Sequence, residues 1–177
     1  MMSLTVTFWM YVITFAVVGA MRGWVKELLV VFSVILCLFL INVLDTFTPV
    51  FRVLAGSPIS LFWVKTILLL VLTFFGYQSP NIPKIASTGK LARDRLQDVL
   101  LGFVLGAING FFVFGTIWYF LDSAGYPFSF IYPPMDGDPL AQSAYNMLPF
   151  LPPNWLVPPY IYFAVGLAFV FVLVVFI

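Results

Sequence analysis

The stretch that decides the fold is Leu100–Asp122, with the sequence LLGFVLGAINGFFVFGTIWYFLD. A helix of about 20 residues crosses the roughly 30 Å hydrocarbon core of a bilayer, so this stretch is long enough to span one. Gly102, Gly106 and Gly110 recur every fourth residue and therefore share one face of that helix. Because small residues let helix backbones approach closely in a membrane, we expect this face to be a helix-packing surface.

The partner of this glycine face is predicted to be another apolar run of the same chain. The first run offers Gly19 or Ala16, and the last run offers Gly166. Bulky residues such as Phe111 occupy the other sides of the stretch. The closest helix contact in the bundle is therefore expected along the glycine face.

Composition excludes most soluble functions. Of the 177 residues 63% are hydrophobic and 8% are charged, whereas an ordinary soluble domain carries about 25% charged residues. The net charge of +1 argues against nucleic-acid binding, which needs clustered positive charge. There is no histidine, and Cys37 is the only cysteine, so the commonest general base and metal ligand is absent and no internal disulfide can form. We find no catalytic, metal or cofactor motif and predict a non-enzymatic protein without a cofactor.

Five apolar runs predict an all-α integral membrane protein, a bundle of five transmembrane helices in a single membrane domain. They are 17 to 22 residues long and cover 3–20, 28–44, 59–76, 100–121 and 160–177. Lysine and arginine concentrate on cytoplasmic links. Six basic residues fall on one side of the predicted bundle, against Arg52 on the other: Arg22, Lys26, Lys84, Lys90, Arg93 and Arg95. We therefore expect the N-terminus outside and the C-terminus in the cytoplasm.

The link 122–158 is predicted to be an external loop. With Pro159 it holds nine of the thirteen prolines, and it is also rich in aromatic residues. Asp138 and Pro139 are typical of a helix start, and Pro149 would end that helix. Its apolar face would carry Leu140, Ala144, Met147 and Leu148. Two interpretations are open: an interfacial lid over the bundle, or a docking surface for another membrane subunit.

Two of the polar residues inside the predicted spans, Lys65 and Asn109, are candidates for a specific role. Lys65 is six residues into the third run, where a lysine is costly and is a candidate ion or substrate site. The alternative is that Lys65 extends its stem to the outer surface, or pairs with Asp45 or Asp122. Asn109 lies beside the glycine face and is expected to make an interhelical hydrogen bond.

Two segments together resemble the colicin V production protein (CvpA) family over about residues 5–121. Gly19–Leu29, GAMRGWVKELL, is similar to the family's turn G-x-x-R-G-[FW]-x-[KR]-E-x-x, and Arg95–Gly102, RLQDVLLG, is similar to its entry into the fourth helix. Where family members often carry arginine before the last glycine, this chain has Asn109. The resemblance implies a small protein of the bacterial inner membrane with at least four helices.

The first of these segments also makes physical sense as a cytoplasmic turn. Gly23 permits a tight reversal, and Arg22 and Lys26 would hold the turn in the cytoplasm. Glu27 would lie in the first turn of the second helix, where the helix dipole favours a carboxylate.

Two functions remain open from the sequence. The first is a scaffold or accessory subunit, whose partners are the lipid bilayer and other integral membrane subunits, with no nucleic acid. The alternative is a component of an export or transport system or a channel.

Overall fold

The computed structural model describes residues 4–49, 51, 53, 56–78, 92–129, 131 and 139–176. Every element in these ranges is helical, which confirms the all-α prediction. The elements are α1 (Leu4–Arg22), α2 (Trp24–Phe47), α4 (Pro58–Tyr77), α6 (Ala92–Ser123), α7 (Pro139–Met147), the 3₁₀ helix η1 (Leu148–Phe150), α8 (Pro152–Trp155) and α9 (Tyr160–Phe176). Arg52, Lys84, Lys90 and Asp138, which entered the sequence-based predictions, lie outside the described residues.

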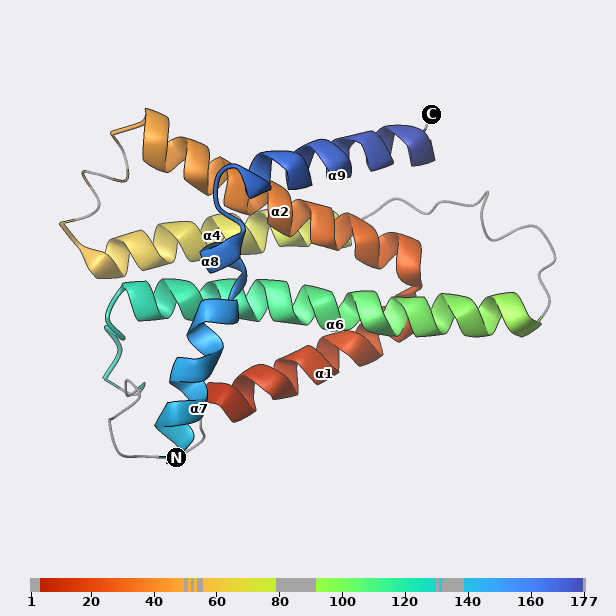
Figure 1. The fold of residues 1–177 in the computed structure, drawn as a ribbon, viewed down its shortest axis with the longest axis horizontal. Coiled ribbons are helices and arrows are strands. Elements are labelled where there is room, and N and C mark those ends of the chain that lie inside the picture. The colour runs from red at the N-terminus through yellow and green to blue at the C-terminus, as the bar shows by residue number, and fades with distance from the viewer. Residues whose placement is uncertain are drawn as a thin grey trace.

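Four helices are long and apolar enough to cross a membrane, judged by length and composition: α1, α2, α4 and residues Arg95–Ser123 of α6. They contain the described parts of the first four predicted runs. The fifth run forms α9, which has 17 residues and is shorter than the other four. With 32 residues, α6 is about 48 Å long, and its N-terminal end projects beyond the neighbouring helices (Figure 1).

Local sequence explains where the helices begin and end. Gly23 separates α1 from α2 with a φ of 86°, a left-handed conformation that favours glycine. Pro58 occupies the first turn of α4, where its missing N–H costs no helical hydrogen bond. At the end of α2, Thr48 donates its side-chain hydroxyl to the carbonyl of Leu44 at 2.7 Å.

The long helices pack in a defined order. Helix α1 lies along α6, α2 contacts both α4 and α6, and α9 lies on α2 (Figure 1). The main core is built from inward-facing residues of α2, α4 and α6, among them Val34, Leu69 and Val113. The buried faces of α4 and α6 also carry polar residues, which are Thr66 and Thr73 on α4 and Asn109 and Thr116 on α6.

The segment from α7 to α8 runs across α6 toward the start of α9 (Figure 1). Ala144 and Leu151 are buried in a second cluster with Phe8 of α1 and Trp118 of α6. Helix α7 begins at Pro139, as predicted. It ends at Met147, and Pro149 follows within η1. The segment therefore contributes to the core of the bundle.

Candidate functional site

A buried ion pair joins the ends of α1 and α2. The Arg22 Nη1 atom donates to Glu27 Oε1 at 2.6 Å, and the Glu27 side chain is 0% exposed. From α6, the Asn109 side-chain nitrogen donates to Glu27 Oε2 at 2.8 Å and to the Glu27 backbone oxygen at 2.9 Å. We call these three residues the Arg22–Glu27–Asn109 network; they tie α1, α2 and α6 together.

Helix α4 joins this network through its last residue. The second terminal nitrogen of Arg22 donates to the Tyr77 backbone oxygen at 3.0 Å. The guanidinium carbon lies 4.2 Å from the centroid of the Tyr77 ring, a cation–π contact. Arg22 therefore contacts the ends of two other helices at once.

The physical consequence is a charge pair that is costly to break. A buried carboxylate without a partner is strongly unfavourable, and removing one member of a buried pair typically costs about 3–5 kcal/mol. Here both carboxylate oxygens of Glu27 accept hydrogen bonds. The position of Glu27 in the first turn of α2 adds the favourable field of the helix N-terminus.

The contact between Glu27 and Asn109 was not predicted from the sequence. It placed Glu27 in a cytoplasmic turn with Lys26, and Asn109 separately beside the glycine face. Lys26 is half-buried, but Glu27 points into the bundle and is fully buried. The available signal was that Glu27 is the only acidic residue before Asp45 and that Asn109 is the only amide in its run.

The glycine face of α6 lies against α1. A Cβ atom added to Gly106 would come within 2.9 Å of the Gly19 Cα and also strike the Phe15 backbone oxygen. Gly102 faces the Gly19 backbone oxygen, and a Cβ at Gly110 would meet the Val12 Cα at 2.9 Å. A Cβ on Gly166 of α9 would meet nothing within 4 Å. The Gly166 alternative is therefore wrong, and Gly19 is the partner.

Asp98 closes the same end of the bundle. Its Oδ1 atom accepts a hydrogen bond from the backbone nitrogen of Trp24, the first residue of α2, at 3.3 Å. A Cβ at Gly23 would come within 3.0 Å of Asp98 Oδ2. Asp98 therefore binds the first backbone N–H of α2, whereas the ion pairs among the described residues are Arg22–Glu27 and Lys65–Asp45.

Lys65 forms its ion pair near the other end of α2. Its Nζ atom lies 3.2 Å from Asp45 Oδ2, and 5.2 Å from the centroid of the Phe51 ring. Asp45 was one of the two partners proposed for Lys65. The Asp45 side chain is 45% exposed, so the pair lies at an exposed position.

Several buried polar atoms of the core have no hydrogen-bond partner among the described residues. They are the side-chain oxygens of Thr66, Thr73, Tyr77, Asn109 and Thr116. All five belong to α4 or α6. In contrast, Thr14, Ser33 and Thr46 each donate to the carbonyl four residues before them. The buried hydroxyls of Thr66, Thr73, Tyr77 and Thr116 are therefore available to bind a ligand.

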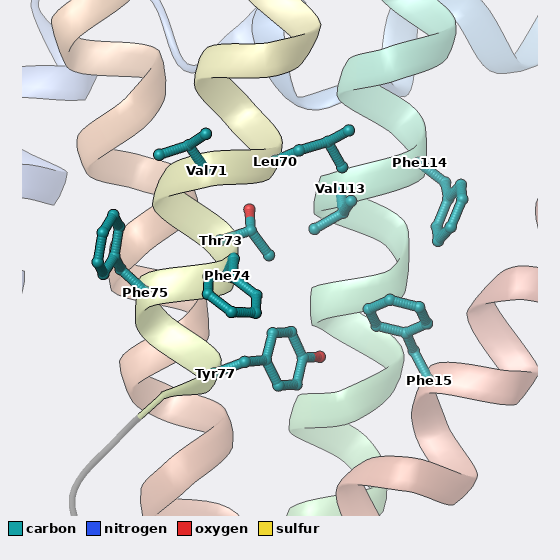
Figure 2. Close-up of a pocket in the computed structure, with 9 residues that line it drawn as sticks. All are labelled: Phe15, Leu70, Val71, Thr73, Phe74, Phe75, Tyr77, Val113 and Phe114. Carbon is teal, nitrogen blue, oxygen red and sulfur yellow. The ribbon is translucent and has the colours of Figure 1, made fainter.

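A groove of about 630 Å³ lies beside these hydroxyls, between α4, α6 and α1. Figure 2 shows Thr73 and Tyr77 directed from α4 toward α6, with Phe15 of α1 on the far side. The rest of the lining is apolar and includes Leu70, Val113 and Phe114. Tyr77 therefore belongs both to this groove and, through its contact with Arg22, to the network.

No metal centre is indicated in the described part of the chain, where no group of three or more His, Cys, Asp or Glu residues comes together. In comparisons with known proteins, no protein-family model, no curated protein and no solved structure matches the chain.

Proposed function

We propose that the chain is a non-enzymatic multi-pass protein of the bacterial inner membrane, similar to the CvpA family, and that it acts as a scaffold or accessory subunit for other integral membrane proteins. Four apolar helices of sufficient length support the membrane location. The resemblance of Gly19–Leu29 and Arg95–Gly102 supports the family and the compartment.

In the proposed topology α9 is the fifth span, the N-terminus lies outside and the C-terminus in the cytoplasm. Three contacts support this arrangement. Asp98 bonds the start of α2, which brings the basic segment around Arg95 to the same end as Arg22. Phe171 packs on Phe32, and Tyr162 on Phe39. Helix α9 thus runs antiparallel to α2, and its C-terminal end points toward the Arg22 end.

In this topology the segment from α7 to α8 is the external lid over the bundle. Its buried contacts with α1 and α6 support the lid more than the docking surface, because the apolar side chains of the segment are already covered by these two helices.

The observation that carries the subunit role is the exposed face of α9. Phe163, Gly166, Leu167 and Val170 fall at helical spacing i, i+3, i+4 and i+7, on one side of the helix. Phe163 is 75% and Leu167 73% exposed, and the space in front of Gly166 is open. A glycine among bulky residues forms a hollow that a side chain of a partner helix can fill, as in membrane helix pairs.

Co-purification tests this role. The full chain, tagged and extracted in a mild detergent, is expected to bring down a membrane protein in fixed stoichiometry. Gly166→Leu should fill the hollow and reduce recovery of that partner. Val104→Leu, which alters an exposed residue of α6, should leave recovery unchanged. A chain recovered alone after crosslinking in intact membranes would contradict the subunit role.

The second candidate is a component of an export or transport system or a channel. The unpartnered oxygens of Thr66, Thr116 and Asn109 favour it, because polar groups inside a helical membrane bundle mark pathways for ions and solutes. The test is proton or ion leak across proteoliposomes containing the full chain. A leak that Thr116→Val reduces would support transport, and vesicles as tight as protein-free ones would argue against it.

A further inference from the structure

The groove between α4, α6 and α1 is lined mainly by apolar side chains and carries its two hydroxyl residues, Thr73 and Tyr77, toward the end where α1 and α4 terminate. Tyr77 is the last residue of α4, and Arg22, the last residue of α1, stacks on its ring at 4.2 Å. Thr73 lies one turn further into α4, or about 6 Å along the axis. Beyond Thr73 the lining is apolar, with Leu70 and Val113. A cation, then two hydroxyls, then hydrocarbon follow one another from the helix ends inward.

The two hydroxyls of this groove are free to bind a ligand. Thr73 is 6% exposed, and within the described residues neither its Oγ1 nor the Tyr77 Oη has a hydrogen-bond partner. Other helical hydroxyls of the chain, such as that of Ser33, return to their own backbone. Because an unmade bond at a buried hydroxyl is costly, a ligand acceptor at this depth would be favoured.

We propose that this groove binds one anionic phospholipid of the cytoplasmic leaflet. The phosphate would lie beside Arg22, the ester oxygens would accept hydrogen bonds from Tyr77 and Thr73, and one acyl chain would follow Leu70, Val113 and Phe114. The inference rests on the proposed membrane location and orientation. The groove volume of about 630 Å³ falls within the usual range of ligand pockets, about 300–1,000 Å³.

Charge and depth select this ligand. The cytoplasmic end of the described bundle carries Arg22, Lys26 and Arg95 against Glu27 and Asp98, so that basic residues remain in excess although Arg22 is paired with Glu27. Basic residues at this surface attract anionic headgroups. A phospholipid has its phosphate, ester and acyl groups in the same order, from the surface inward, as Arg22 beside the Tyr77 ring, the two hydroxyls and the apolar lining of the groove.

Native mass spectrometry of the full chain in detergent tests the inference, with phosphatidylglycerol and phosphatidylcholine as probes after delipidation. We expect phosphatidylglycerol to bind several-fold more tightly than phosphatidylcholine. Thr73→Val and Tyr77→Phe remove one hydroxyl each and should weaken phosphatidylglycerol binding by about 2- to 10-fold, the range for one hydrogen bond. Leu70→Trp should block the acyl position and abolish binding.

Thr66→Val is the matched control. Thr66 is also buried on α4 and also lacks a partner among the described residues, but it does not line the groove. Its binding should equal that of the unaltered chain. Equal loss in Thr66→Val and Thr73→Val, or equal binding of the two lipids, would overturn the lipid site.

Carbonate extraction of cell membranes separates this outcome from failure of the proposed function. A chain that resists extraction but binds both lipids equally retains the membrane role and lacks the site. A chain released by carbonate refutes the membrane location itself. Melting temperatures of the variants, within a few degrees of the unaltered chain, establish that each one is folded.

Discussion

Asn109 of α6 holds Glu27 of α2 by two hydrogen bonds, one to the carboxylate at 2.8 Å and one to the backbone oxygen at 2.9 Å. A single amide thereby fixes both the side chain and the backbone at the start of α2. The same carboxylate accepts a bond from Arg22. Three helices therefore depend on one buried acid.

Loss of the Glu27 charge should be strongly destabilising. Glu27→Gln leaves Arg22, only 22% exposed, without its counter-ion, and we expect a loss of about 3–5 kcal/mol. Asn109→Leu removes the donor to Oε2 and should cost about 1–3 kcal/mol. The free energy of unfolding in mild detergent, followed by circular dichroism, measures both.

The matched control for Asn109→Leu is Thr116→Val. Thr116 lies on the same buried stripe of α6, but its hydroxyl has no partner among the described residues. Its replacement should change stability by less than about 0.5 kcal/mol, because no hydrogen bond is lost. Similar losses in the two variants would show that burial, not the bond to Glu27, sets the cost at Asn109. The double variant of Glu27 and Asn109 should fall short of additivity.

The Lys65–Asp45 pair should contribute little. Exposed pairs contribute about 0–1 kcal/mol, and the Asp45 side chain is 45% exposed. Lys65→Met is therefore expected to change the melting temperature by only a few degrees and to leave assembly intact. If the variant folds normally and yet loses function in cells, Lys65 acts on an ion or solute, and the transport candidate gains weight.

Tyr126 predicts a loss of stability at high pH. Burial raises its pKa from 10.0 to about 12, with Asp122 adding to the shift and the hydrogen bond from Trp118 opposing it. Below pH 10 the ring is neutral in both folded and unfolded chains, so its contribution is complete. Between pH 10 and 12 the unfolded chain ionises first, and stability falls. Tyr126→Phe should show a shallower fall over that interval, and identical pH profiles would contradict the raised pKa.

Hydrophobic patterning was sufficient to predict that the five apolar runs are helical, but not η1 or α8. The described parts of all five apolar runs are helical, and Pro139 and Pro149 marked the bounds of α7 closely. These features depend on local sequence, because the length of an apolar run and the position of a proline act within one helix.

The network could not be predicted in the same way, because it depends on which helix faces are brought together. Glu27 and Asn109 are 82 residues apart, and their contact requires that α6 presents one face to α1 and another to α2. The glycine spacing indicated the first face. Nothing in the sequence indicated that the second face, which carries Asn109, would meet the start of α2 at Glu27.

The contact of Gly106 with Gly19 is the one that sets this geometry, and it gives the sharpest prediction for stability. A Cβ at Gly106 would come within 2.9 Å of the Gly19 Cα. Because the Gly19 Cα is a backbone atom, the clash can be relieved only if helix α1 as a whole moves away from α6. Gly106→Leu should therefore force α1 from α6, at the cost of about 1–3 kcal/mol that overpacking usually causes. Val104→Leu, two residues away and 54% exposed, places the same leucine side chain outside the contact and should melt like the unaltered chain. Gly166→Leu, where space is open, should do the same in the isolated chain. Equal melting temperatures for Gly106→Leu and Val104→Leu would show that α1 and α6 are not in backbone contact.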